Sequence, residues 1–324
     1  MQTERKFKKV INKIGITMIL FFVFINVLVF VQSKISLCLE KTLPYDISYI
    51  ISELLYGLAY FLSFVIPGII LYFMMGKNEK NYSLLTPVIP SPINTAAYIF
   101  ASISIILTMA IINANIVSVF NYSEYSSKYL WDNGPRSAYQ VVLAFITSAL
   151  IPAFAEEFLF RGAIFSALMP YGKTPAIIIS ALLFGLMHQN IEQLLYTTAA
   201  GLVLAFVVCE TGSIWCGVLI HFFNNFTDIL KSELIERFPL NVSYPLYIAI
   251  EGAMFILGLA SIVYLILTRA KRGSKNTDLK EKEPIPAKAI SKHFFSSPTI
   301  IFFIVISSIM MTIHIILSIL TSVL

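Results

Sequence analysis

Residues 141–168, VVLAFITSALIPAFAEEFLFRGAIFSAL, form a largely apolar run that carries three charged side chains, Glu156, Glu157 and Arg161. A run of this kind can cross a bilayer as a helix, which takes about 20 predominantly apolar residues. Placing an ionisable side chain inside a membrane costs free energy. The few that occur there usually face the protein interior and belong to a functional site. This stretch therefore predicts a membrane helix and a functional centre within it.

The whole chain has the composition of a membrane protein. Of its 324 residues, 57% are hydrophobic and 13% are charged, whereas soluble domains carry about 25% charged residues. Nine apolar runs are predicted to span the membrane: 15–32, 49–75, 95–120, 138–160, 174–190, 193–209, 213–230, 244–268 and 298–322. We therefore expect an all-α, polytopic membrane helical bundle with about eight or nine transmembrane helices.

The basic residues predict the orientation of the chain. Residues 5–13 contain five lysines and arginines, which places the N-terminus in the cytoplasm by the positive-inside rule. Alternating the predicted spans puts further basic loops on the same side: Lys77 and Lys80, Lys173, and 269–272. The net charge of +5 is therefore explained by the orientation of the chain and by contact with anionic membrane lipids. We expect no nucleic-acid partner. The short loops favour a bacterial cell membrane.

Five segments are predicted along the chain. They are N-terminal membrane helices over 1–137, a catalytic core over 138–232, a further membrane helix within 233–268, a polar and solvated cytoplasmic linker over 269–297, and a detached C-terminal membrane helix within 298–324. The linker is predicted from its charge and its prolines.

Helix lengths predict that distant polar residues meet at one depth. Glu156 lies 16 residues before Gly172, and His188 lies 16 residues after it. If the chain folds back at Gly172, both side chains lie about 24 Å from the turn. A second turn near Gly212 brings His221 and Asn225 to a similar layer, about 14 and 20 Å from that turn. The sequence therefore predicts one site built by several helices.

Two spacings of four residues add supporting groups, because such residues share one helix face. Glu157 and Arg161 are predicted to pair, so that the arginine holds this carboxylate ionised and oriented. Phe184 precedes His188 by four residues and places an aromatic wall beside that imidazole.

Two hydrolytic chemistries fit these residues. In the first, a buried carboxylate beside a histidine deprotonates water and later protonates the leaving amine. In the second, Glu156, His188 and His221 hold zinc and leave one coordination position for water. In either, Asn225 could donate a hydrogen bond to the oxyanion of a tetrahedral intermediate, and so could His221. Using Glu156 as a ligand removes it as a base, so no cofactor is favoured, with zinc as the alternative.

Three motifs resemble those of the CPBP family, also called the Abi or CAAX-protease family: Glu156-Glu157-x-x-x-Arg161, Phe184-x-x-x-His188 and His221-x-x-x-Asn225. The similarity covers about residues 138–230. It implies an intramembrane endopeptidase, glutamate-type or metallo, acting on a hydrophobic or lipidated peptide or protein. It also implies that Glu156 activates water with His188, that His221 and Asn225 bind the oxyanion, and that Glu157 and Arg161 support the site.

Two functions of other classes stay open. The first is a non-catalytic membrane scaffold or bacteriocin self-immunity protein, which the resemblance also allows. The second is an ion-coupled transporter that uses the buried carboxylates. The lack of an evident internal repeat counts against the transporter.

Overall fold

The computed structural model describes residues 2–75, 89–118, 135–269 and 285–323, and within these ranges every regular element is a helix. The elements are α1 (Gln2–Thr42), α2 (Tyr45–Met74), α3 (Pro92–Ser118), α5 (Ala138–Ala144), η3 (Phe145–Leu150), α6 (Ile151–Glu157), η4 (Phe158–Phe165), α7 (Ser166–Leu168), η5 (Met169–Tyr171), α8 (Lys173–Met187), α9 (Ile191–Thr211), α10 (Ile214–Arg237), α11 (Leu240–Leu267), α13 (Ala287–Phe295) and α14 (Pro298–Val323). The predicted all-α class is confirmed.

Seven helical stretches in the described part are long and apolar enough to cross a membrane. They are α1, α2, α3, the continuous stretch Ala138–Tyr171, α9, α11 and Pro298–Leu317 of α14. The predicted span 174–190 corresponds to α8, which has 15 residues, and 213–230 corresponds to α10, whose polar residues keep it outside this set. A polytopic helical bundle is confirmed, with α8 and α10 packed among its spans.

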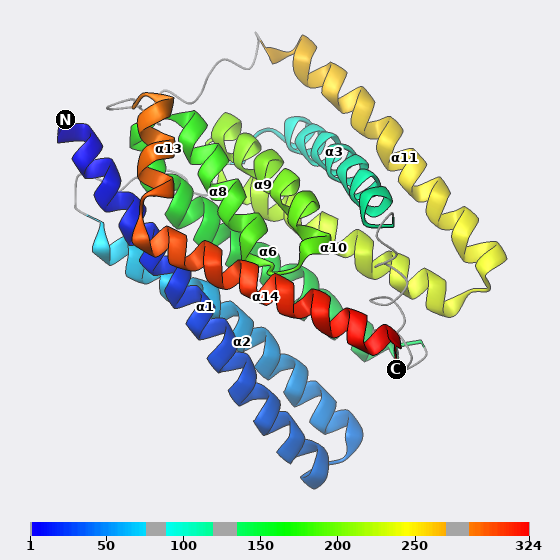
Figure 1. Ribbon diagram of the computed structural model, residues 1–324. Coiled ribbons are helices and arrows are strands. Elements are labelled where there is room, and N and C mark those ends of the chain that lie inside the picture. Colours follow the sequence, from blue (N-terminus) through cyan, green and yellow to red (C-terminus); the bar gives the residue numbers. More distant parts are fainter. Residues whose placement is uncertain (1, 76–88, 119–134, 270–284, 324) are drawn as a thin grey trace.

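The helices that carry the predicted site lie in the middle of the bundle (Figure 1). α8 pairs with α9, and α10 contacts α6, η3, α9 and α3. α1 and α2 form a hairpin on one side, where α2 packs against α6 and η4. α3 and α11 cover the other side, where α3 packs against α9. The predicted site residues are therefore surrounded by further membrane helices.

Both predicted turns are present, and each uses a glycine with a positive φ. Gly172 has φ 133° between η5 and α8, and Gly212 ends α9 in the left-handed conformation at φ 68°. Residues with a Cβ rarely adopt these conformations, which glycine adopts without strain. The chain folds back at the two places on which the depth argument depends.

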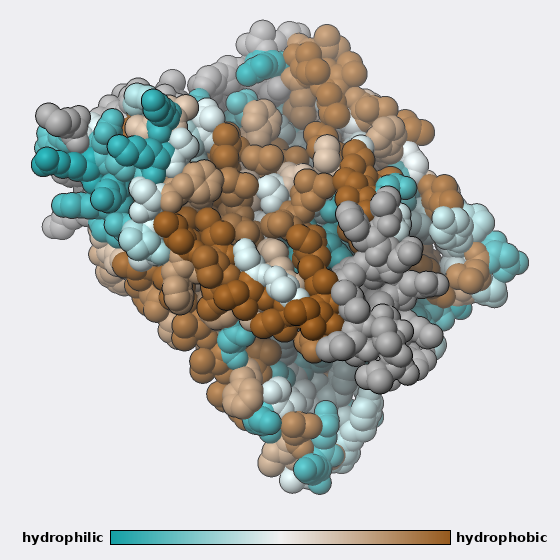
Figure 2. Space-filling view, in the orientation of Figure 1, coloured by the Kyte–Doolittle hydropathy of each residue, from teal (hydrophilic) through white to brown (hydrophobic). Residues whose placement is uncertain are grey.

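The outer surface is apolar where a bilayer would contact it. Large side chains on α1 and α11 are exposed, among them Phe30 at 60%, Ile256 at 68% and Ile266 at 67%. Figure 2 shows hydrophobic residues across the middle of the molecule and hydrophilic residues gathered at the end where Figure 1 places the N-terminus. Exposed apolar surface of this extent is typical of contact with lipid. The chain is an integral membrane protein.

The segment 269–297 differs in part from the predicted solvated linker. Residues 270–284 lie outside the described part, but α13 is a helix that packs against α1. Ile285 and Phe294 are buried, and the Ser297 hydroxyl donates to Oδ1 of Asn12 at 2.6 Å. The prediction followed the charges and prolines and overlooked the apolar side chains of Ile285 and Phe294, which are buried against the bundle. α14 also packs against α1, so the last helix is attached to the bundle.

Candidate active site

The segment with the two glutamates departs from regular α-helix on both sides. α6 lies between two π-helical stretches, η3 before it and η4 after it. Pro152, at the start of α6, lacks the N–H that a regular ladder would use. Wider π-helical turns are rare and occur often at functional sites. Here they bracket Glu156 and Glu157, which are 3% and 0% exposed.

The predicted pair between Glu157 and Arg161 is confirmed. Nη1 of Arg161 donates to Oε1 of Glu157 at 2.6 Å, and both side chains are 0% exposed. Nη2 of Arg161 donates to the carbonyl of Gly201 in α9 at 2.9 Å, and the guanidinium lies 4.6 Å from the centre of the Phe184 ring. A buried ion pair needs such additional hydrogen bonds to offset the desolvation of its charges. Arg161 therefore joins η4 to α8 and α9 behind the site.

α10 approaches the same carboxylate at a glycine. A Cβ built on Gly217 would lie 2.7 Å from Oε2 of Glu157, closer than a side chain can be accommodated without movement. The absence of a side chain at this position lets the α10 backbone pack against the carboxylate. This close approach brings the next turn of α10, which carries His221, to the two glutamates.

His221 lies between the two glutamates. Its Nδ1 is 3.3 Å from Oε1 of Glu157, within hydrogen-bonding distance, and its Nε2 is 3.9 Å from Oε2 of Glu156. The imidazole is also in edge-to-face contact with the Phe184 ring, with 5.8 Å between ring centres. A carboxylate only accepts, so Nδ1 donates to Glu157, and this bond orients Nε2 toward Glu156.

Glu156 has a partner that sequence reasoning missed. The hydroxyl of Tyr60, in α2, donates to Oε1 of Glu156 at 2.6 Å. Oε2 of Glu156 is buried and has no hydrogen-bond partner among the described residues. Tyr60 is one of 16 tyrosines and lies in an apolar helix far from the motifs, so no pattern in the sequence distinguishes it. It fixes one oxygen of the carboxylate and leaves the other for chemistry.

His188 follows the last residue of α8, where its ring is oriented by the backbone. Its Nδ1 lies 2.9 Å from the carbonyl oxygen of Phe184, and the two rings are in edge-to-face contact at 5.2 Å. A carbonyl only accepts, so Nδ1 carries the proton and Nε2 of the neutral ring has a free lone pair. The Phe184 ring thus contacts both imidazoles, as well as the Arg161 guanidinium.

Asn225 lies one helical turn beyond His221 on α10. Its Oδ1 accepts a hydrogen bond from Asn224 at 3.3 Å, and Asn224 also donates to the Tyr196 hydroxyl at 2.9 Å. These contacts occupy the acceptor of Asn225, and its Nδ2 group is the part that an oxyanion would use. The structure therefore joins the other predicted site residues through direct contacts: Glu156, Glu157, Arg161, Phe184, His188 and His221. Asn225 lies one turn beyond His221 and contacts Asn224.

The residues considered for zinc do not form a ligand set in this arrangement. In the described ranges no three His, Cys, Asp or Glu side chains are grouped to hold a metal ion. Ligand nitrogens and oxygens lie about 2.0–2.2 Å from zinc. Nδ1 of each histidine already faces an oxygen, of Glu157 for His221 and of Phe184 for His188. These bonds leave Nε2 as the nitrogen through which each imidazole would bind a metal ion.

Comparison with known proteins places the similarity in the same part of the chain. Residues 138–227 match the family described as Type II CAAX prenyl endopeptidase Rce1-like. This stretch contains all three motifs, and the resemblance predicted from them is confirmed there.

A curated relative is similar over a somewhat longer stretch. The Bacillus subtilis (strain 168) protein named "Putative membrane peptidase YdiL" is 34% identical over 116 residues, which is 35% of this chain. The match spans about half of that relative, 47% of its length. No solved structure matches the chain. Tyr60 lies outside the residues that match the family.

Proposed function

We propose that this protein is an intramembrane endopeptidase that hydrolyses a peptide bond in a hydrophobic or lipidated peptide. The environment of the Glu156 carboxylate carries the proposal: one oxygen accepts the Tyr60 hydroxyl at 2.6 Å, and the other faces Nε2 of His221 at 3.9 Å. A general base must be held in place and still have a free lone pair. The names of the matched family and of the relative, an endopeptidase and a membrane peptidase, support the same reaction.

Water is activated at Oε2 of Glu156 in this proposal. The 3.9 Å between Oε2 of Glu156 and Nε2 of His221 exceeds a hydrogen bond, so Oε2 keeps a lone pair for the proton of the attacking water. As the water oxygen attacks the peptide carbonyl carbon, its proton moves to Oε2. The free lone pair on Nε2 of His188 supports a second contact with this water. Glu156 then gives the proton to the leaving nitrogen as the C–N bond breaks, which yields an acid and an amine.

The oxyanion of the tetrahedral intermediate takes hydrogen bonds from α10. Nδ2 of Asn225 is a donor at a suitable place, one turn from His221. His221 donates from Nε2 when both of its ring nitrogens carry protons, because Nδ1 already donates to Glu157. Glu157 and Arg161 hold His221 and take no part in bond breaking.

A cavity between α3 and α9, connected to the site through Tyr196, supports a peptide substrate. It has a volume of about 510 Å³ between α3 and α9 and is lined by polar side chains, among them Asn113, Gln193 and Tyr196. Tyr196 accepts a hydrogen bond from Asn224, which also donates to Asn225, so two hydrogen bonds connect the cavity lining to Asn225. Polar groups in an otherwise apolar bundle suit the polar backbone of a peptide. The apolar part of the substrate would remain in the bilayer.

The basic residues near the N-terminus support a location in a bacterial cell membrane with the N-terminus of the protein in the cytoplasm.

The reaction is tested with isotopically labelled water. Purified full-length protein in lipid is incubated with three peptides of one sequence: prenylated on cysteine, acylated, and unmodified. Hydrolysis is expected to place one oxygen-18 atom in each new carboxyl group, measured by mass spectrometry. Cleavage of a lipidated peptide should exceed that of the unmodified one. If none of the peptides is cut faster by the wild type than by Glu156→Gln, a non-catalytic scaffold explains the protein better.

Cleavage is also expected to continue after exhaustive chelation, with less than one zinc per chain by elemental analysis. The reason is a conflict of roles: a zinc-bound Glu156 would leave Glu157 as the base, and Glu157 is already bound to Arg161. The measurement compares rates before and after dialysis against a chelator. Loss of activity that zinc alone restores would contradict the prediction.

A further inference from the structure

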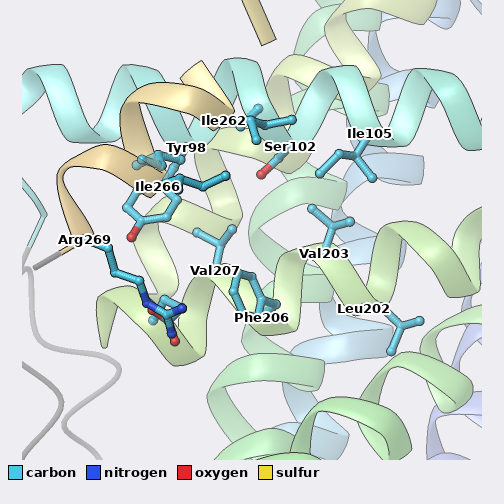
Figure 3. Close-up of a pocket in the computed structure, with 13 residues that line it drawn as sticks. Tyr98, Ser102, Ile105, Leu202, Val203, Phe206, Val207, Ile262, Ile266 and Arg269 are labelled. Atoms are coloured by element: carbon cyan, nitrogen blue, oxygen red, sulfur yellow. The ribbon is translucent and has the colours of Figure 1, made fainter. Parts of the chain in front are cut away.

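A second cavity lies on the opposite side of α9 from the glutamates. It has a volume of about 440 Å³ between α3, α9 and α11. Figure 3 shows Ile105 from α3, Val203 and Phe206 from α9, and Ile262 and Ile266 from α11 pointing into it. Its size is in the range of small-ligand sites, about 300–1,000 Å³, and its lining suits a hydrocarbon chain.

α9 separates this cavity from the active site. The carbonyl of Gly201 accepts the hydrogen bond from Arg161 on one side of the helix, whereas Leu202 and Val203 line the cavity on another. The residues that line it include none of the site residues named above. Of its lining, the α3 and α11 residues also lie outside the stretch that matches the family. A ligand here would not compete with the peptide for Glu156.

The charged residues of the cavity lining lie at one end. Glu210, at the end of α9, and Arg269, just beyond α11, line this end together with Tyr98 near the start of α3. In Figure 3, Arg269 and Tyr98 lie at one end and Leu202 at the other. From Leu202 to Glu210 the helix rises about 12 Å. An apolar groove therefore leads to a carboxylate and a guanidinium where three membrane helices begin or end.

We propose that this cavity binds a zwitterionic phospholipid with a primary ammonium group, of the phosphatidylethanolamine type. One acyl chain lies in the groove, Arg269 binds the phosphate, and Glu210 accepts hydrogen bonds from the ammonium. An anionic lipid such as phosphatidylglycerol binds Arg269 through its phosphate but supplies no cation for the carboxylate of Glu210. A trimethylated choline headgroup has no N–H to donate to Glu210. The opposite charges of Glu210 and Arg269 at one end of the cavity thus favour a headgroup with a primary ammonium over an anionic or a choline headgroup.

The test measures lipid binding directly. Full-length protein in detergent is mixed with equal amounts of dioleoyl phosphatidylethanolamine, phosphatidylcholine and phosphatidylglycerol, and native mass spectrometry counts the bound lipids. Phosphatidylethanolamine is expected to be preferred. Glu210→Gln and Arg269→Gln should each lower its binding about tenfold or more, the loss for a charge-assisted hydrogen bond. Val203→Trp, which fills the groove, should lower the binding of all three lipids.

Matched variants separate the cavity from general effects. Lys288→Gln removes an exposed positive charge on α13, and Leu195→Trp places a tryptophan at an exposed position of α9, so both variants should bind lipid as the wild type does. Equal binding of the three lipids, unchanged by Glu210→Gln, would overturn the proposal. So would a Val203→Trp protein that binds lipid normally and has a raised KM for the lipidated peptide alone, because the groove would then hold the substrate.

Discussion

Replacing Glu156 with glutamine is expected to lower the rate of peptide cleavage by about 10²–10⁴-fold, the usual contribution of a general base. Glutamine keeps the size of the side chain and an oxygen that can accept the Tyr60 hydroxyl, which lies 2.6 Å from Oε1 in the wild type. Its amide cannot take a proton from water. The chemistry should therefore be lost while the fold is kept, as measured by initial rates and by thermal unfolding of the same preparations.

The matched control is Glu251→Gln. Glu251 is also a glutamate in a membrane helix and also accepts a hydrogen bond from a tyrosine, Tyr247, but it lies on α11 away from the site. Its substitution should leave the cleavage rate within a small factor of the wild type. A wild-type rate for Glu156→Gln would rule out Glu156 as the base and with it the proposed mechanism.

Much of the site could be predicted because its parts are local or depend on helix length. The pair of Glu157 and Arg161 follows from a spacing of four residues, and it forms although η4 is π-helical. The turn at Gly172 follows from the residue type, since a positive φ is needed there. Equal helix lengths on the two sides of a turn then bring Glu156 and His188 toward one layer. Such features need no knowledge of the other helices.

The remainder depends on packing between helices that no local pattern encodes. Tyr60 reaches Glu156 because α2 packs against α6, and a tyrosine in an apolar helix has many other uses. The contact of His221 with both glutamates depends on how closely α10 approaches at Gly217. The packing of α13 could not be predicted because its apolar face is short and lies in a charged segment. The roles of the site residues in catalysis stay predictions until the variants are measured.

Arg161→Ala is expected to destabilise the protein by about 3–5 kcal/mol, the cost of removing one member of a buried ion pair. The substitution leaves Glu157 as a buried carboxylate, removes the donor to Gly201, and empties the space against the Phe184 ring. Low yield and a lower midpoint of thermal unfolding in detergent should follow. Arg136→Ala is the comparison, because its pair with Glu233 is partly exposed, with a side chain 27% accessible for Arg136. Arg136→Ala should lower the free energy of unfolding by about 1 kcal/mol or less.

A double substitution distinguishes the charge from the volume. Glu157→Gln with Arg161→Met removes the stranded carboxylate and refills the space, so it should be more stable than Arg161→Ala. It should stay below the wild type because the Gly201 carbonyl loses its donor, a loss of about 1–3 kcal/mol for a buried unsatisfied group. It should also cleave poorly, since His221 loses the carboxylate that orients it. If Arg161→Ala unfolds at the wild-type temperature, Arg161 does not hold these helices together, and the positioning role given to the pair is wrong.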